Sequence, residues 1–216
     1  MHGQTPVRWT SQMNHGLQCQ CGAFRGYIKN PKAGSRVICY CRDCQAFAHF
    51  LNRAEDILDS QGAGDIVQVS PSKLVFTQGK DLLTNMKLTE AGMLRWYTRC
   101  CNTPVGNTPA NYKVAFVGLA RICLVGDRDD ITRTFGPVAI RSSSKSAKGQ
   151  VPRNSPRMIF AIGHFFSLLV GGLLRGSYRR TPFFHSANGH PVVSPKPLST
   201  QELQNIKARL LLPPSV

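Results

Sequence analysis

Seven of the eight cysteines in this chain lie in short clusters, and this clustering constrains the fold more than any other feature. Thiolates spaced one or two residues apart are typical ligands of a borderline metal, above all of tetrahedral zinc with Zn–S bonds of about 2.3 Å. The sequence therefore predicts a zinc protein. The clusters are Cys19-Gln20-Cys21, Cys39-Tyr40-Cys41-Arg42-Asp43-Cys44 and the adjacent pair Cys100 and Cys101.

Disulfide bonds are a poor explanation of the same cysteines. A chain of 216 residues can bury a core without covalent staples. Cys19 and Cys21 are also too close in sequence to pair well with each other. Residues 1–16 contain no apolar stretch of the kind found in a secretory signal. We therefore expect a reducing, cytoplasmic location. The eighth cysteine, Cys123, lies in an apolar run and is expected to be a core residue.

The middle cluster supplies the candidate catalytic residues. Cys39, Cys41 and Cys44 offer three thiolates in a short turn, which leaves a tetrahedral zinc with one open position for water or substrate. Arg42, within the same turn, is a candidate for binding a carboxylate of an anionic ligand. The alternative is a purely structural zinc whose fourth ligand is Asp43, a water molecule or a distant residue.

The other two clusters predict a second zinc site. Cys19 and Cys21 provide two ligands and need distant partners, and Cys100 and Cys101 are available. Such a closed site would fix the N-terminal segment to a later part of the chain and contribute directly to folding. His15, just before the first cluster, is expected to be a solvated loop residue rather than a ligand.

The charge of the chain is strongly positive and unevenly distributed. The formal net charge is +16, and residues 131–201 contain ten Lys or Arg but no Asp or Glu. This pattern predicts an anionic partner, which would be nucleic acid, a membrane surface or an acidic small molecule. A solvated basic face without a specific partner is the alternative.

Residues 14–127, which hold every cysteine, are predicted to form a mainly β, antiparallel zinc-binding domain. Short apolar segments alternate there with turn signals and show no long helical pattern. The expected β segments are residues 23–29, 36–40, 46–51, 66–69, 73–77 and 93–97. Periodicity does not decide between strand and helix for residues 112–125.

The remainder is predicted to be a basic flexible linker, residues 141–157, and a helical basic extension, residues 158–216. The uncharged run of residues 158–174 is shorter than the roughly 20 apolar residues of a membrane span. We expect a helix that packs on the β domain or lies at a membrane interface. Ser199-Thr200-Gln201-Glu202 predicts a capped start for a last helix, which should end at Pro213-Pro214.

Three motifs resemble the glutathione-dependent formaldehyde-activating enzyme family, which has the Mss4-like fold and includes centromere protein V-like domains. They are Cys-Gln-Cys-Gly-Ala-Phe (19–24), Cys-Tyr-Cys-Arg-Asp-Cys-Gln (39–45) and Cys-Asn-Thr-Pro (101–104). The resemblance covers about residues 18–107. It implies an antiparallel β domain with a structural zinc on Cys19, Cys21 and Cys101, and a labile, functional zinc on Cys39, Cys41 and Cys44.

The resemblance also implies a reaction. The family joins formaldehyde to the thiol of glutathione, which makes zinc the expected cofactor and glutathione the expected co-substrate of a carbon–sulfur lyase. One departure concerns the last motif, where Thr98 stands in place of a family cysteine and Cys100 lies beside Cys101 instead. The structural site then has either four protein sulfurs on a bent backbone or only three.

Two functions follow as hypotheses. The first is a zinc-dependent enzyme that condenses glutathione, or a similar small anionic thiol, with formaldehyde or another small aldehyde. The second is a non-enzymatic zinc-binding module whose basic C-terminal region binds nucleic acid or another anionic partner. A further hypothesis is a peripheral membrane protein that is anchored by residues 158–174 and their flanking arginines.

Overall fold

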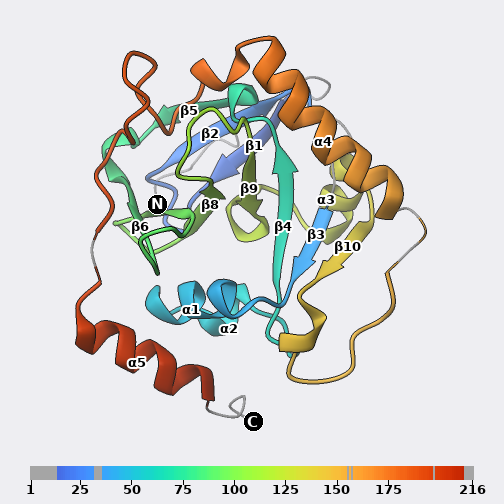
Figure 1. The fold of residues 1–216 in the computed structure, drawn as a ribbon, viewed down its shortest axis with the longest axis vertical. Coiled ribbons are helices and arrows are strands. Elements are labelled where there is room, and N and C mark those ends of the chain that lie inside the picture. The colour runs from blue at the N-terminus through green and yellow to red at the C-terminus, as the bar shows by residue number, and fades with distance from the viewer. Residues whose placement is uncertain (1–13, 32–35, 155, 157, 197, 212–216) are drawn as a thin grey trace, which may run out of the picture.

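The computed structural model describes residues 14–31, 36–154, 156, 158–196 and 198–211. Over these residues the protein is mainly β, with two sheets and several helices packed around them (Figure 1). This confirms the predicted fold class at the level of a β-rich domain. Residues 1–13, which make up most of the segment in which the sequence shows no secretory signal, lie outside the described residues.

The smaller sheet has the strand order β1-β2-β5 and is antiparallel throughout. Gly26 on β2 pairs with Phe76 on β5, next to an irregularity in the register of the two strands. A Cβ atom at this position would collide with the Val75 carbonyl oxygen, so the close approach of the two strands requires glycine. The strands are β1 (Asn14–Gln18), β2 (Arg25–Lys29) and β5 (Leu74–Gln78).

The larger sheet has the order β10-β3-β4-β9-β8-β7-β6. Its pairs are antiparallel except for β10 and β3, which run parallel. A parallel pair needs a long crossover connection, and here nearly the whole β domain separates the two strands in sequence. The strands are β3 (Arg36–Cys39), β4 (Gly64–Val69), β6 (Leu83–Met86), β7 (Leu94–Thr98), β8 (Pro104–Thr108), β9 (Val117–Ala120) and β10 (Val138–Ser142).

The prediction of a β segment at residues 46–51 is wrong, because this run belongs to helix α1 (Arg42–Phe50). The Cys41 side chain caps the helix by accepting a hydrogen bond from the backbone N–H of Cys44. Asp43 in the first turn suits the positive end of the helix dipole. The apolar run was therefore the buried face of a helix whose start is a cysteine, a residue that is not a usual capping signal.

The described residues form four further α-helices: α2 (Ala54–Ile57), α3 (Arg128–Phe135), α4 (Met158–Leu174) and α5 (Thr200–Leu211). The capping box predicted for α5 is confirmed. Glu202 accepts a hydrogen bond from the Ser199 backbone N–H, and the Ser199 hydroxyl accepts one from that of Glu202. The predicted stop at Pro213-Pro214 lies outside the described residues. None of the described helices has the length and apolarity needed to cross a membrane.

The main core lies between the sheets and includes side chains from the C-terminal region. Phe183 is fully buried, with its ring 4.9 Å from that of Trp96 and 5.5 Å from that of Phe76. Cys123 is buried in the same core, as predicted, and so is Trp96. The C-terminal region therefore contributes to the packing of the β domain itself.

The segment predicted as a flexible linker begins inside the large sheet. Arg141 and Ser142 pair with β3, and the Lys148 backbone N–H donates to the Gln61 carbonyl at 3.0 Å. The remaining division of the chain into a domain, a linker and an extension stays a prediction.

Candidate metal centres

The middle cysteine cluster lies where strand β3 ends and helix α1 begins. Cys39 ends the strand, Cys41 is the N-cap of the helix, and Cys44 lies in its first turn. The extended backbone at Cys41 followed immediately by helix turns the chain back on itself. As a result the three sulfur atoms lie within 4.8 Å of one another. We call these three residues the triplet.

Hydrogen bonds among the sulfurs concentrate negative charge in the triplet. Hydrogen bonds from the Cys41 and Cys44 thiols lower the pKa of Cys39 to about 2, with a smaller contribution from Ser142. The same bonding to Cys39 raises the pKa of Cys41, and raises that of Cys44 well above its ordinary value. The Cys41 and Cys44 thiols therefore favour the thiolate form of Cys39, and a cation would be favoured beside it.

Two residues that the sequence analysis missed support the triplet. Ser142 on β10 is paired with Cys39 on β3 and lies beside its sulfur. Gln45 is buried, and its side-chain amide donates to the Tyr40 carbonyl at 2.8 Å and the Ser146 carbonyl at 3.0 Å. Ser142 and Ser146 follow the triplet by about 100 residues. No local sequence signal predicts this contact.

Arg42 and Asp43, the other members of the same turn, are both exposed. Asp43 makes an ion pair with the buried Arg95 at 3.3 Å. Among the described residues, the group of potential ligands that comes within 4.8 Å here consists of the three sulfurs alone. Arg42 projects from the first turn of α1 with its guanidinium available to an anionic ligand.

The other four candidate ligands, Cys19, Cys21, Cys100 and Cys101, come together in space, and we call them the second cluster. In a tetrahedral site with Zn–S bonds of about 2.3 Å, neighbouring sulfurs lie about 3.8 Å apart. The sulfur of Cys19 lies 3.5 Å from that of Cys21 and 3.8 Å from that of Cys100, and the Cys21 and Cys100 sulfurs are 3.4 Å apart. The Cys100 and Cys101 sulfurs are 3.7 Å apart. These four sulfurs already have the spacing of a four-thiolate site.

Two tight turns create this geometry. In the first, after β1, Gly22 adopts a positive φ of 76° and its N–H donates to the Cys19 carbonyl, which folds Cys21 back toward Cys19. In the second, Cys100 and Cys101 lie in the turn between β7 and β8, where Asn102 has a φ of 51°. The turn, and not an extended strand, allows two adjacent cysteines to face the same centre.

Hydroxyl groups hydrogen-bond the sulfur of Cys101. Thr103 Oγ1 lies 3.1 Å from it, and Thr98 Oγ1 lies 3.5 Å away. Burial raises the pKa of Cys101, but these contacts and others bring it down to about 5, whereas burial raises that of Cys100 to about 12. Thr98, which replaces a family cysteine in the resemblance, thus stands beside the ligand group as a hydrogen-bonding residue.

A family model matches residues 12–194, which include both cysteine clusters and α4. The chain belongs to DUF6151, a family of unknown function. No curated protein matches it. A crystal structure of a Rhodobacter sphaeroides protein from a structural genomics programme shows limited similarity. It has 16% sequence identity and a TM-score of 0.42, and the match covers 59% of this chain and 99% of the other.

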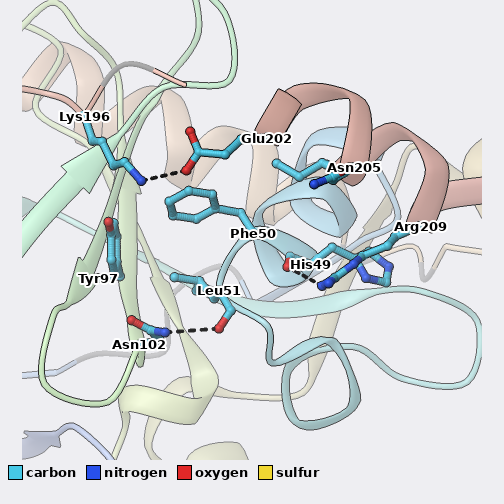
Figure 2. Close-up of a pocket in the computed structure, with 10 residues that line it drawn as sticks. His49, Phe50, Leu51, Tyr97, Asn102, Lys196, Glu202, Asn205 and Arg209 are labelled. Atoms are coloured by element: carbon cyan, nitrogen blue, oxygen red, sulfur yellow. Dashed lines mark hydrogen bonds and ion pairs between the residues drawn. The ribbon is translucent and has the colours of Figure 1, made fainter. Parts of the chain in front are cut away.

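The DUF6151 match ends at residue 194, and the segment that follows it, which includes helix α5, forms one side of a pocket that Figure 2 shows in close-up. The pocket has a volume of about 350 Å³ and lies between the end of α1, strand β7 and helix α5. Lys196 pairs with Glu202 across it at 2.7 Å, and Arg209 donates to the His49 carbonyl. Its lining residues are His49, Phe50, Leu51, Tyr97, Asn102, Lys196, Glu202, Asn205, Ile206 and Arg209.

This pocket is separate from the triplet. His49 follows Cys44 by five residues, which corresponds to about 7.5 Å along the helix axis. His49 therefore lines the pocket at the far end of α1.

The expectation of a solvated loop for His15 is wrong. This histidine lies half-buried on β1, where its ring packs edge-on against Phe135 at 4.8 Å.

Proposed function

We propose that this DUF6151 protein is a zinc-dependent carbon–sulfur lyase that condenses a small anionic thiol with a small aldehyde at the triplet. The observation that carries the proposal is the convergence of Cys39, Cys41 and Cys44 with no fourth protein ligand among the described residues. A three-sulfur site leaves a position for substrate, whereas the four-sulfur cluster is closed. The motif resemblance to the formaldehyde-activating enzymes and their Mss4-like fold supports the same assignment.

The residues around the triplet fit this role. The three thiols would hold the zinc, and Ser142 and Gln45 would keep the Cys39 sulfur and the turn after it in place. Arg42 would pair with a carboxylate of the thiol substrate, because its guanidinium is exposed beside Cys41. The second cluster, at the junction of the two sheets, would hold a structural zinc on four sulfurs.

The proposed reaction is an addition that needs no further reactant. The sulfur of glutathione, or of a similar thiol, forms a bond to the aldehyde carbon, the C=O π bond breaks, and the thiol proton is transferred to the oxygen. Bound zinc would lower the pKa of a coordinated thiol and so supply the thiolate nucleophile at neutral pH. Because the clustered cysteines must be thiols to hold a metal, the proposal includes a reducing, cytoplasmic location for this chemistry.

The decisive experiment measures formation of S-hydroxymethylglutathione from formaldehyde and glutathione by NMR exchange spectroscopy. We expect the zinc-loaded wild type to accelerate the reaction above the uncatalysed rate and Cys41→Ser to remove the acceleration. Cys123→Ala is the matched control, because Cys123 lies in the core outside both clusters. Wild type that shows no acceleration while binding two zinc ions would refute the catalytic assignment and leave the metal sites intact.

The alternative is a non-enzymatic zinc module whose basic region binds nucleic acid. The charge of residues 131–201 favours it. However, Phe183 and Phe184 are buried in the core and are therefore not available to stack on bases. Binding of RNA or DNA that weakens steeply with salt, and that persists in Cys41→Ser, would support this alternative.

A further inference from the structure

Helix α4 has an exposed apolar face on the side opposite its packed face. Successive residues of a helix are about 100° apart, so positions spaced three, four and seven residues apart share a face. Elsewhere in the described chain, the large hydrophobic side chains that are exposed are Val125 and Val192. We define the α4 outer face as Ile159, Phe160, Phe166, Val170, Leu173 and Leu174, whose exposed fractions run from 55% to 80%.

Contacts on the packed side of α4 fix the orientation of the helix and keep the outer face exposed. Phe165 contacts Phe116 with ring centroids 5.2 Å apart, and Gly172 lies so close to Ala115 that a Cβ atom would collide with it. Ala161 is buried on the same side. Figure 1 shows α4 lying along the outside of the molecule. The outer face therefore cannot turn inward without breaking these contacts, and the helix presents it to the surroundings.

Exposed arginines accompany this face. Arg175, Arg179 and Arg180 follow the helix directly, and Arg153 lies before it. No acidic residue occurs anywhere in residues 131–201 to neutralise them. The region thus combines a helical apolar surface about 25 Å long with exposed arginines after its C-terminal end and a basic sequence before its N-terminal end.

The charge decides which occupant fits. A second copy packed on the same face would bring basic residues together in either helix orientation, because both ends of α4 are basic, and this repulsion disfavours a dimer. Nucleic acid would use the arginines but has no use for an apolar face of this size. A bilayer with anionic lipids satisfies both features, since apolar side chains enter the headgroup region and arginines remain at the phosphates.

We propose that α4 is a peripheral membrane-binding helix that lies in the surface of an anionic bilayer with its outer face inserted. The helix lies flat and does not span, which agrees with its length. The packed side faces the protein, so the β domain takes the place of the polar face that isolated interfacial helices carry. This proposal is independent of the chemistry at the triplet.

Vesicle flotation of the full chain tests the proposal. We expect binding to phosphatidylcholine vesicles that contain phosphatidylserine to be at least about tenfold stronger than binding to phosphatidylcholine alone. The triple variant Phe160→Ser, Phe166→Ser and Leu174→Ser should weaken binding by at least about tenfold, because these side chains would be buried in the interface. The control variant Val125→Ser and Val192→Ser removes exposed apolar side chains elsewhere and should bind like wild type.

A second pair of variants tests the charge. Replacing Arg175, Arg179 and Arg180 by Gln should reduce the preference for phosphatidylserine several-fold. The same change at the exposed Arg99, Arg128 and Arg133 alters the net charge equally and should have a smaller effect. All substituted side chains are exposed, so thermal unfolding should show that every variant is folded.

Four results would overturn the proposal. Wild type that floats with neither vesicle is one, and a Phe160/Phe166/Leu174 variant that binds like wild type is another. The third is a concentration-dependent dimer, dissociated by that triple variant, in a protein that does not bind vesicles. Binding of RNA instead of vesicles, retained in the triple variant, would likewise exclude α4 as a lipid contact.

Discussion

The two cysteine clusters should differ in how strongly a bound metal stabilises the fold, because they connect segments at very different sequence separations. The second cluster joins residues that are 81 positions apart, Cys19 and Cys100, whereas Cys39 and Cys44 are five apart. An unfolded chain can still gather the triplet around a metal, but it must close a long loop to gather the second cluster. Binding to the unfolded state reduces the stabilisation that a ligand provides.

The size of this difference follows from loop-closure entropy. Closing a loop costs about (3/2)RT ln n, so loops of 81 and five residues differ by about 2.5 kcal/mol. We therefore expect Cys100→Ser to lower the free energy of unfolding in zinc by about 2.5 kcal/mol more than Cys44→Ser does. For a chain of this size, such a difference corresponds to roughly 5–10 °C in Tm.

Urea unfolding of the zinc-loaded variants, with zinc content measured on the same samples, tests this prediction. Cys100 is exposed and Cys44 is half-buried, so simple loss of packing would act in the opposite direction. Chelation of zinc should abolish the difference in the free energy of unfolding between Cys100→Ser and Cys44→Ser. Equal destabilisation by the two substitutions, with one zinc lost in each, would refute the argument that the second cluster is the structural one.

Three further predictions concern the rest of the molecule. Ser142→Ala should weaken metal binding at the triplet by about tenfold in chelator competition, because it removes the hydroxyl beside Cys39, and should leave the second site unchanged. Phe183→Ala should lower the free energy of unfolding by about 3–5 kcal/mol in urea titrations. Phe160→Ala should lower the free energy of unfolding much less, because Phe160 is exposed. Burial lowers the pKa of His15 below its ordinary value of 6.5, so the neutral form is favoured by folding. The stability that comes from burying neutral His15 is fully present above pH 6.5 and is lost as the pH falls through the folded-state pKa. His15→Gln should therefore make Tm less sensitive to acid.

Each of these three substitutions tests the contribution of one structural feature. A large effect of Phe183→Ala would show that the C-terminal region stabilises the β domain. No effect of Ser142→Ala on metal affinity would mean that the contact between β10 and β3 is only a strand pairing. A Tm of His15→Gln that depends on pH as strongly as wild type would assign the acid sensitivity to other histidines, of which His49 and His164 also have pKa values lowered by burial.

Local spacing in the sequence was enough to indicate which cysteines form the triplet. Cys39, Cys41 and Cys44 lie within a span of six residues, so the bend from the end of β3 into α1 is enough to bring their sulfurs close. The Ser199–Glu202 capping box was predictable for the same reason, because its hydrogen bonds join residues only three apart. Short apolar runs were less informative. Residues 46–51 have no periodicity that separates a strand from a buried helix face, and the helix was decided by the cap at Cys41.

By itself, then, the sequence determined a β-rich chain with two cysteine-rich candidate metal sites and a basic, partly helical C-terminal region. Only the tertiary structure decided that Cys100 and Cys101 share one centre, that Ser142 stands beside Cys39, and that one face of α4 stays exposed. Each of these depends on segments far apart in the chain, or on which side of a uniformly apolar helix meets the sheet. Local residue patterns carry no information about such contacts, because packing between distant segments selects them.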